Sequence, residues 1–313
     1  MKRHGHLFEQ IIDPINIQQA YLDARRGKTA QRIIRICDRD RERRLENIRL
    51  MLIDKTFHTA PYLSMMIYEP KQREIFKLPF YPDRIIHHCL MRVLEPIWSR
   101  LFIADSYACI KGRGLHAGSR KTMEFVRRHK YCLKMDISKF YPSVDHDILF
   151  EMVNHKIKCP DTLWLIRDIV YSYPGGRNVP IGNYTSQWLG NLYLNELDQW
   201  LKHKHHVKAY LRYCDDFCMF HDDKHYLHFL AREIEIFLRE RLRLTLSKNE
   251  IFPVSRGVDF LGYRHFPDHV LLRKTTATRM KRRLRRLPRQ LAAGLIDEKK
   301  YRSILASVSG WLR

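Results

Sequence analysis

Two short segments of the chain place acidic side chains inside apolar, strand-like runs. In the segment from Leu133 to Tyr141 the acid is Asp136, and in residues 210–220 Asp215 and Asp216 are adjacent. A carboxylate inside an apolar strand is costly unless another group compensates its charge, and a bound divalent cation is the usual compensation. These three carboxylates would form the cluster that two-metal phosphoryl transfer requires.

An adjacent pair of aspartates is weak evidence by itself, because Asp often forms the local hydrogen bonds of an ordinary turn. The companion Asp136 strengthens the metal hypothesis, since it also ends an apolar strand and is followed by Phe140-Tyr141. In this interpretation Asp136 and Asp215 bridge both Mg²⁺ ions, and Asp216 assists more peripherally.

The composition restricts the class of partner. Among 313 residues, 57 Lys and Arg outnumber 34 Asp and Glu, which gives a net charge of +23. Such an excess favours a polyanion, either nucleic acid or an anionic membrane surface. No apolar run approaches the roughly 20 residues of a membrane span, so we expect nucleic acid and no membrane partner. The seven dispersed cysteines form no C-x-x-C pair and the N-terminus lacks a signal-peptide pattern, which together favour the cytoplasm.

The hydrophobic pattern predicts an α+β fold, with a small antiparallel sheet backed by helices and with helical ends. Strands are expected at 131–137, on both sides of Cys214-Asp215-Asp216, and at 244–252 and 257–265, with a hairpin at 64–80 that turns at Glu69-Pro70. Helices are expected at 10–27, 30–52, 83–102 with Asp83 as its cap, from the Gly-rich loop 106–118 to Arg128, and at 143–156, 161–171, 181–202, 224–241 and 275–313.

The segment from Arg273 to Arg289 holds nine basic residues in seventeen. Met280, Leu284 and Leu287 form an apolar stripe, so one helix face packs while the other is charged. A merely solvated face would rarely carry charges of one sign only, and we expect this helix to neutralise backbone phosphates. The expected nucleic-acid contacts are Arg279, Lys281, Arg282, Arg283, Arg285 and Arg286, together with Lys111 and Arg113 of the Gly-rich loop.

With these segments in order, the chain resembles the reverse transcriptase family across nearly its whole length. The seven family motifs are matched by residues 73–87, 107–114, 136–141, 181–187, 213–216, Lys248 with its following strand, and 260–263. The resemblance implies a right-hand polymerase without nuclease, integrase or RNase H regions. Its expected parts are an N-terminal helical extension (1–60), fingers (61–135, with 158–185 shared between fingers and palm), a palm with the antiparallel sheet (136–265) and a basic helical thumb (266–313).

The resemblance also implies roles for individual residues. The positions that match the two-Mg²⁺ site are Asp136, Ile137, Asp215 and Asp216, with the three aspartates as the catalytic set.

Four further positions match residues of the family that contact the nucleotide. Arg73 would bind the triphosphate, where a guanidinium suits phosphate oxygens, with help from Lys71. Tyr141 would be the steric gate that rejects a ribose 2′-hydroxyl, and Lys248 would be a general acid near the leaving pyrophosphate. The alternatives, a core aromatic for Tyr141 and a surface lysine for Lys248, stay open.

The fourth motif departs from the common Gln-Gly-x-x-x-Ser-Pro, because it begins with Ile181 and ends with Gln187. This variant resembles the reverse transcriptases of diversity-generating retroelements, in bacteria or phage-infected cells. The resemblance implies a template-repeat RNA copied from dNTPs into cDNA, through an RNA–DNA hybrid, with errors at template adenines, and a small basic pentameric accessory protein. Ile181 can neither donate nor accept a hydrogen bond to the nascent base pair, and Gly182 permits close backbone approach.

Other lineages remain as alternatives. Group II intron-like enzymes usually carry an extension beyond the thumb, whereas this chain ends at Arg313; retron enzymes typically show a Val-Thr-Gly that is not found here. An RNA-dependent RNA polymerase usually has Gly where Cys214 stands. An abortive-infection type, or a relative that binds RNA without polymerising, is also open, although the three carboxylates favour an active enzyme.

Overall fold

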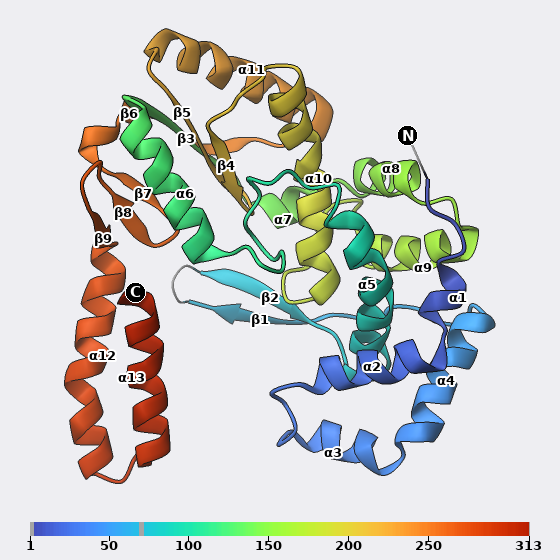
Figure 1. The fold of residues 1–313 in the computed structure, drawn as a ribbon. Helices are drawn as coiled ribbons and strands as arrows, with labels where there is room; N and C mark the ends of the chain where they lie inside the picture. The colour runs from blue at the N-terminus through green and yellow to red at the C-terminus, as the bar shows by residue number, and fades with distance from the viewer. Residues whose placement is uncertain (1–2, 69–71, 313) are drawn as a thin grey trace.

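A central antiparallel sheet organises the chain, with helices on both of its faces (Figure 1). The structure, a computed structural model, describes residues 3–68 and 72–312. Four strands pair in the order β4-β5-β3-β6, and the predicted α+β fold class is confirmed. The strands are β3 (Tyr131–Ile137), β4 (Tyr210–Tyr213), β5 (Asp216–His221) and β6 (Leu246–Pro253).

Side chains of β3 alternate between the two faces of this sheet. On one face Leu133 and Met135 join Phe217 in the main hydrophobic core, under α10 and α11. On the other face Cys132 joins a second cluster with residues of α6, and Asp136 follows Cys132 on that face. The covering helices are α6 (Leu115–Arg128), α10 (Tyr184–His203) and α11 (Lys224–Leu242). Asp136 therefore lies on the face of the sheet that packs against α6.

A small three-stranded sheet extends the second cluster. The strand predicted at 257–265 is in fact two strands, because Leu261 and Gly262 take left-handed φ values of 57° and 83° and reverse the chain. Phe260 packs with Phe125 of α6 in the second cluster. The elements are η2 (Val254–Arg256), β7 (Val258–Phe260), β8 (Tyr263–His265) and β9 (Val270–Leu272).

Four helices form the N-terminal part. The single helix predicted at 30–52 is wrong, since the chain bends at Asp40, whose φ and ψ of −131° and 38° are not helical. Ile34 of the first piece and Ile48 of the second both belong to the main core. The helices are α1 (Phe8–Ile11), α2 (Pro14–Arg25), α3 (Arg32–Arg39) and α4 (Arg41–Ile53).

The predicted hairpin is present as two antiparallel strands whose pairing runs from Leu63 opposite Lys77 to Ile67 opposite Arg73. Its predicted Glu69-Pro70 turn lies outside the described residues. The strands are β1 (Leu63–Ile67) and β2 (Arg73–Lys77).

Asp83 is not the helix cap that the sequence predicted. Its side chain is buried and its Oδ1 accepts a hydrogen bond of 2.8 Å from the backbone N–H of Ala60, so it fixes the approach to β1. Burial raises the pKa of this carboxyl. The π-helical turn η1 (Phe80–Arg84) runs directly into α5 (Ile85–Trp98).

Two other predicted helices begin later than expected. The helix predicted at 143–156 begins at His146, because Asp145 caps it by accepting from the N–H groups of Asp147 at 3.1 Å and Ile148 at 3.3 Å. The long helix predicted from Ile181 begins at Tyr184. The helices between β3 and α10 are α7 (Phe140–Ser143), α8 (His146–Lys156) and α9 (Pro160–Tyr171).

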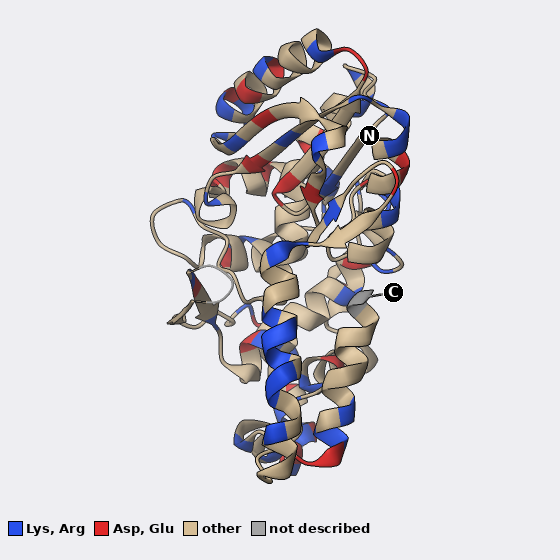
Figure 2. Ribbon diagram, turned by 90° about the vertical axis from the view of Figure 1, so that its left-hand side faces the viewer, with Lys and Arg blue, Asp and Glu red and all other residues tan. Residues whose placement is uncertain are grey.

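A helical hairpin, α12 (Lys274–Ala292) and α13 (Glu298–Leu312), extends from the small sheet beside the hairpin β1–β2 (Figure 1). Leu287 is buried and Met280 and Leu284 are half-buried, as the apolar stripe predicted. Lys and Arg form a band along the outer side of α12 (Figure 2). Within the described ranges, no helix is long and apolar enough to cross a membrane.

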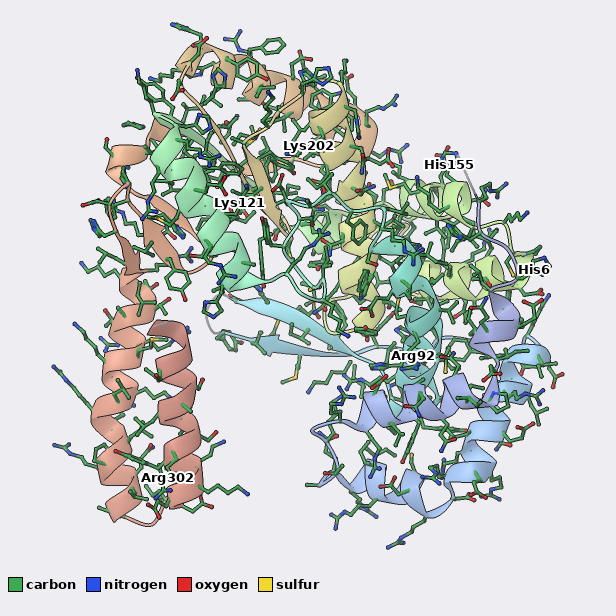
Figure 3. All side chains as sticks on the ribbon, in the orientation of Figure 1. His6, Arg92, Lys121, His155, Lys202 and Arg302 are labelled. Atoms are coloured by element: carbon green, nitrogen blue, oxygen red, sulfur yellow. The ribbon has the colours of Figure 1, made fainter. Side chains whose placement is uncertain are left out.

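A buried ion pair joins α10 to β4. Arg212 and Asp198 are both fully buried, and the guanidinium donates to the carboxylate at 2.8 Å from Nε and 2.5 Å from a terminal nitrogen. The hydroxyl of Tyr210 donates to Asp198 Oδ1 at 2.6 Å. Nearby, the ammonium of Lys202 (Figure 3) pairs with Asp105 at 2.8 Å, and so anchors the segment that precedes the Gly-rich loop.

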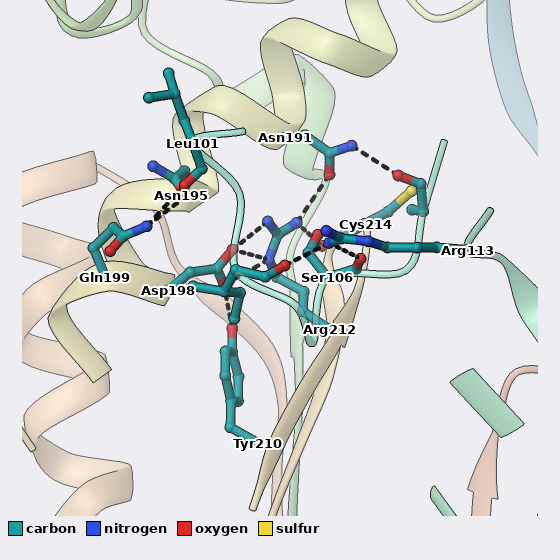
Figure 4. Close-up of polar contacts among 12 residues, drawn as sticks. Leu101, Ser106, Arg113, Asn191, Asn195, Asp198, Gln199, Tyr210, Arg212 and Cys214 are labelled. Carbon is teal, nitrogen blue, oxygen red and sulfur yellow. Dashed lines mark hydrogen bonds and ion pairs between the residues drawn. The ribbon is translucent and has the colours of Figure 1, made fainter. Parts of the chain in front are cut away.

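Arg212 also reaches the tip of the β4–β5 hairpin (Figure 4). Its other terminal nitrogen donates to the backbone carbonyl of Cys214 at 3.0 Å and to Asn191 Oδ1 at 3.1 Å. The side-chain amide of Asn191 donates in turn to the backbone carbonyl of Ala108 at 2.9 Å. One guanidinium thus fixes the hairpin tip relative to α10, and Asn191 fixes the Gly-rich loop to the same helix.

Arg212→Met should lower the free energy of unfolding by about 3–5 kcal/mol, because it leaves the Asp198 carboxylate buried without its counter-ion. The measurement is urea denaturation followed by circular dichroism. Lys121→Met is the matched control: it breaks the partly exposed pair of Lys121 with Glu124 (2.9 Å) and should cost far less than Arg212→Met. Equal losses in the two variants would contradict the structural role of Arg212.

Candidate active site

The three predicted catalytic aspartates come together at one end of the central sheet. Asp136 of β3 lies directly opposite Asp216 of β5 in the antiparallel pairing. Asp215 belongs to the two-residue turn between β4 and β5, in which Cys214 has a left-handed φ of 54°. The backbone N–H of Ile137 donates to the carbonyl of Asp215 at 3.4 Å, so the predicted set of four residues is contiguous.

Two of these carboxylates each accept a hydrogen bond from a different side chain. Asp136 Oδ2 accepts from the hydroxyl of Ser247 at 2.7 Å, and Asp216 Oδ2 pairs with the ammonium of Lys134 at 3.3 Å. Asp216 Oδ1 is buried and has no hydrogen-bond partner among the described residues. Burial raises the pKa of Asp216 to about 6; Lys134 opposes this shift, and the charges of Asp136 and Asp215 add to it.

This arrangement suits a hard cation. Across residues 3–68 and 72–312, no three His, Cys, Asp or Glu side chains are already gathered closely enough to enclose a metal ion. The buried, unpartnered Oδ1 of Asp216 and the mutual repulsion of three carboxylates are nevertheless what a divalent cation would relieve. Carboxylate oxygens are the ligands that Mg²⁺ prefers. The donor set therefore fits the predicted Mg²⁺ site.

Tyr141 lies beside the turn that carries Asp215. Its ring is half-buried, 5.1 Å from the ring of Phe140, and it also borders Gly190 of α10. Burial, together with the nearby thiol of Cys214, raises the pKa of the Tyr141 hydroxyl. The side chain therefore lies near the carboxylates, and its role as a steric gate remains a prediction.

The turn that contains Ile181 docks onto the edge of the hairpin β1–β2. The backbone N–H of Phe76 donates to the carbonyl of Ile181 at 2.7 Å. Gly182 has a φ of 120°, and a Cβ there would lie 2.5 Å from the carbonyl oxygen of Phe76, so only glycine fits. Arg73 is exposed at the start of β2, the strand that holds this turn.

The structure says less about the three other residues that are predicted to contact the nucleotide. Lys248 of β6 lies opposite Asp136 in the strand pairing, and its ammonium is 3.2 Å from Glu250 Oε2. Gln187 is exposed on the first turns of α10. Lys71 lies outside the described residues. The roles of all three remain predictions.

The predicted nucleic-acid contacts fall into two groups. In the Gly-rich loop Lys111 is exposed, whereas Arg113 is half-buried and donates to the carbonyls of Ile103 at 2.5 Å and Ser106 at 3.0 Å, which gives it a structural task. Six side chains on α12 are exposed, and no ion pair joins any of them to another described residue. These six are Arg279, Lys281, Arg282, Arg283, Arg285 and Arg286.

Three important contacts were missed by sequence reasoning: those of Lys134, Ser247 and the Arg212–Asp198 pair. The signal for Lys134 and Arg212 was available, since each is a cation within an apolar strand, where a charge needs a buried partner. Ser247 gave no such signal, because a serine beside a strand is common.

Comparison with known proteins now identifies the family. Residues 70–265, which include all three aspartates, match the model of the family "Reverse transcriptase (RNA-dependent DNA polymerase)". The chain belongs to this family. The predicted enzyme class, an RNA-directed DNA polymerase, is confirmed at the level of the family.

Two curated proteins are similar in sequence to this reverse transcriptase chain. Protein YkfC of Escherichia coli strain K12 is 24% identical over 258 residues, which are 66% of this chain and 68% of YkfC. The group II intron-encoded protein LtrA of Lactococcus lactis subsp. cremoris is 24% identical over 173 residues, which are 51% of this chain and 28% of LtrA. The match thus spans well under a third of LtrA.

Among solved structures, an apo telomerase from Candida tropicalis, truncated from its C-terminal domain, superposes with a TM-score of 0.51 at 11% identity. The superposition covers 71% of this reverse transcriptase chain and 58% of the telomerase chain. At this identity the likeness concerns the fold alone, and it confirms the predicted right-hand polymerase fold.

In metal-free protein, the contribution of Asp216 to the free energy of unfolding should fall as the pH rises from about 4 to about 6. The pKa of Asp216 rises from 3.8 to about 6 on folding, so the folded state binds more protons than the unfolded state in this range. The slope contributed by one such group is at most about 1.4 kcal/mol per pH unit.

Urea denaturation at several pH values in EDTA measures this slope. The difference in pH dependence between the wild type and Asp216→Asn isolates this contribution, and Glu235→Gln, on the exposed face of α11, should keep the wild-type pH dependence. Identical pH dependence in Asp216→Asn and the wild type would contradict the contribution of Asp216.

Proposed function

We propose that this chain copies a template-repeat RNA into cDNA with errors at template adenines, in a diversity-generating retroelement. Membership of the reverse transcriptase family supports polymerisation, and the sequence from Ile181 to Gln187 is the single observation that carries the mutagenic subtype. The proposed substrates are dNTPs and an RNA template, and the product is cDNA in an RNA–DNA hybrid. A small basic pentameric accessory protein is the proposed protein partner.

In the proposed reaction Asp136, Asp215 and Asp216, with Ile137 beside them, would hold two Mg²⁺ ions, which activate the primer 3′-hydroxyl and neutralise the triphosphate. Tyr141, held next to Asp215, would exclude a ribose 2′-hydroxyl and so select deoxynucleotides.

Arg73 would bind the triphosphate, with Lys71 in support. Strand β2 carries Arg73 and is hydrogen-bonded to the carbonyl of Ile181. Arg73 at the triphosphate and Ile181 at the nascent base pair would therefore move together. Lys248, across the sheet from Asp136, would donate a proton to the leaving pyrophosphate.

The nucleic acid would lie against α12, whose six exposed cations neutralise phosphates without regard to sequence. Lys111 would add a contact from the Gly-rich loop. The proposed parts of the hand keep the predicted bounds: fingers at 61–135, palm at 136–265 and thumb at 266–313, after an N-terminal extension at 1–60.

A second candidate is a faithful reverse transcriptase of a group II intron-like lineage, and the similarity to LtrA favours it. The two candidates differ in the fidelity of the product. Both would copy an RNA template by the same order of chemical steps.

Primer extension on an RNA template with dNTPs and Mg²⁺ tests the polymerase, with and without the accessory protein of the same retroelement. We expect full-length cDNA whose errors gather at template adenines, and loss of extension to background in Asp215→Ala/Asp216→Ala. Faithful cDNA would favour the group II-like candidate. No synthesis under either condition would reject polymerisation and favour a protein that only binds RNA.

Ile181→Gln should lower misincorporation at template adenines by roughly twofold to tenfold, as expected from one hydrogen bond worth about 0.5–1.5 kcal/mol to a correct base pair. Sequencing of the cDNA measures the change. Ile181→Val, which adds no polar group, is the matched control and should keep the wild-type error rate. An unchanged error rate in Ile181→Gln would remove Ile181 from the explanation of infidelity.

A further inference from the structure

Lys134 occupies an unusual position for a lysine. It lies in β3, between two other strands of the central sheet, and only 6% of its surface is exposed. Because side chains alternate along a strand, it points to the same face as Asp136, two residues later. A buried ammonium has three N–H donors and needs acceptors for them.

The acceptors of Lys134 come from two different sheets. Its ammonium pairs with Asp216 Oδ2 at 3.3 Å and donates to the backbone carbonyl of Asp259 in β7. It also lies 5.4 Å from the centre of the Phe260 ring. Lys134 thereby occupies one oxygen of Asp216 and leaves the buried Oδ1, which has no hydrogen bond within the described part of the chain, for another ligand.

The contacts continue from Asp259 to the thumb. Asp259 Oδ1 accepts from Arg273 at 2.7 Å from Nε and at 2.6 Å from a terminal nitrogen. Arg273 directly precedes α12, and its backbone N–H donates to the carbonyl of Gly262 at 2.9 Å. An unbroken series, Asp216–Lys134–Asp259–Arg273, therefore joins a catalytic carboxylate to the first residue before the basic helix.

We propose that Lys134 is a positioning residue that orients Asp216 for metal binding and couples it to the start of α12. The proposal rests on the proposed polymerase function, since it assigns α12 to the template–primer and Asp216 to the metal. Binding of nucleic acid to α12 shifts Arg273 and Asp259, and Lys134 transmits that shift to Asp216. By reciprocity, metal at Asp216 then favours the thumb position that binds nucleic acid.

The direct test measures Mn²⁺ binding by electron paramagnetic resonance, with and without an RNA–DNA template–primer that ends in a dideoxynucleotide. In the wild type we expect the duplex to tighten Mn²⁺ binding at least about fivefold, the lower end of typical coupling between sites. Lys134→Met and Arg273→Met should each reduce this factor to below about twofold, and Lys134→Arg should restore most of it. Lys121→Met, which removes a lysine paired with Glu124 on α6, should keep the wild-type factor.

A coupling factor that is unchanged in Lys134→Met would overturn the proposal. Metal bound by the duplex itself is the same in every variant, so it cannot produce a difference between them. If Lys134→Met does not fold, Asp259→Asn and Arg273→Met decide the question, since both leave the pair of Lys134 with Asp216 in place. Wild-type coupling in those two variants would likewise reject the connection to α12.

Kinetics supply a second readout once kcat is calculated per folded molecule, because loss of folded protein by itself lowers the apparent kcat at unchanged KM. Lys134→Met should lower kcat of primer extension about tenfold, as loss of a residue that orients a metal ligand typically does, with KM for the dNTP nearly unchanged. A wild-type chain that couples Mn²⁺ and duplex binding without extending primers would reject the proposed function alone. A chain that extends primers but whose coupling is insensitive to Lys134→Met would reject only the present proposal.

Discussion

The ion pair of Arg212 and Asp198 is the constraint on which the geometry of the site depends. Both groups are fully buried, so neither can exchange its partner for water, and the guanidinium is oriented by the carboxylate. The nitrogen that remains holds the backbone carbonyl of Cys214, at the tip of the hairpin that presents Asp215. A surface ion pair would leave this tip free to move. Because the pair is buried, this one electrostatic contact fixes the position of the hairpin that carries Asp215 and Asp216, two of the predicted catalytic residues.

The rest of the site is assembled by backbone contacts between segments that are distant in sequence. Asp136 meets Asp216 because β3 pairs with β5, and the Ile181 turn meets β2 because Gly182 allows a close approach to Phe76. Few of these positions rely on side-chain packing alone.

The sequence was informative wherever a residue type conflicted with its surroundings. The aspartates in apolar strands predicted the site, and the period of the hydrophobic residues predicted most strands and helices. Helix starts failed at His146 and Tyr184, and the assignment of Asp83 as a cap failed, because a capping aspartate and one that binds a distant backbone N–H look alike in sequence. The partners of Lys134 could not be read from the chain either, since they depend on how β7 is placed against β3.

The uniformly positive charge of α12 affects the stability of the helix when no nucleic acid is bound. Arg279 and Arg283, and likewise Lys281 and Arg285, are spaced four residues apart on the same helix, where like charges destabilise it by about 0.2–0.5 kcal/mol per pair. A polyanion removes this repulsion, so by mass action it stabilises the helix that binds it. Helix α12 is thus least stable when no polyanion is bound to it.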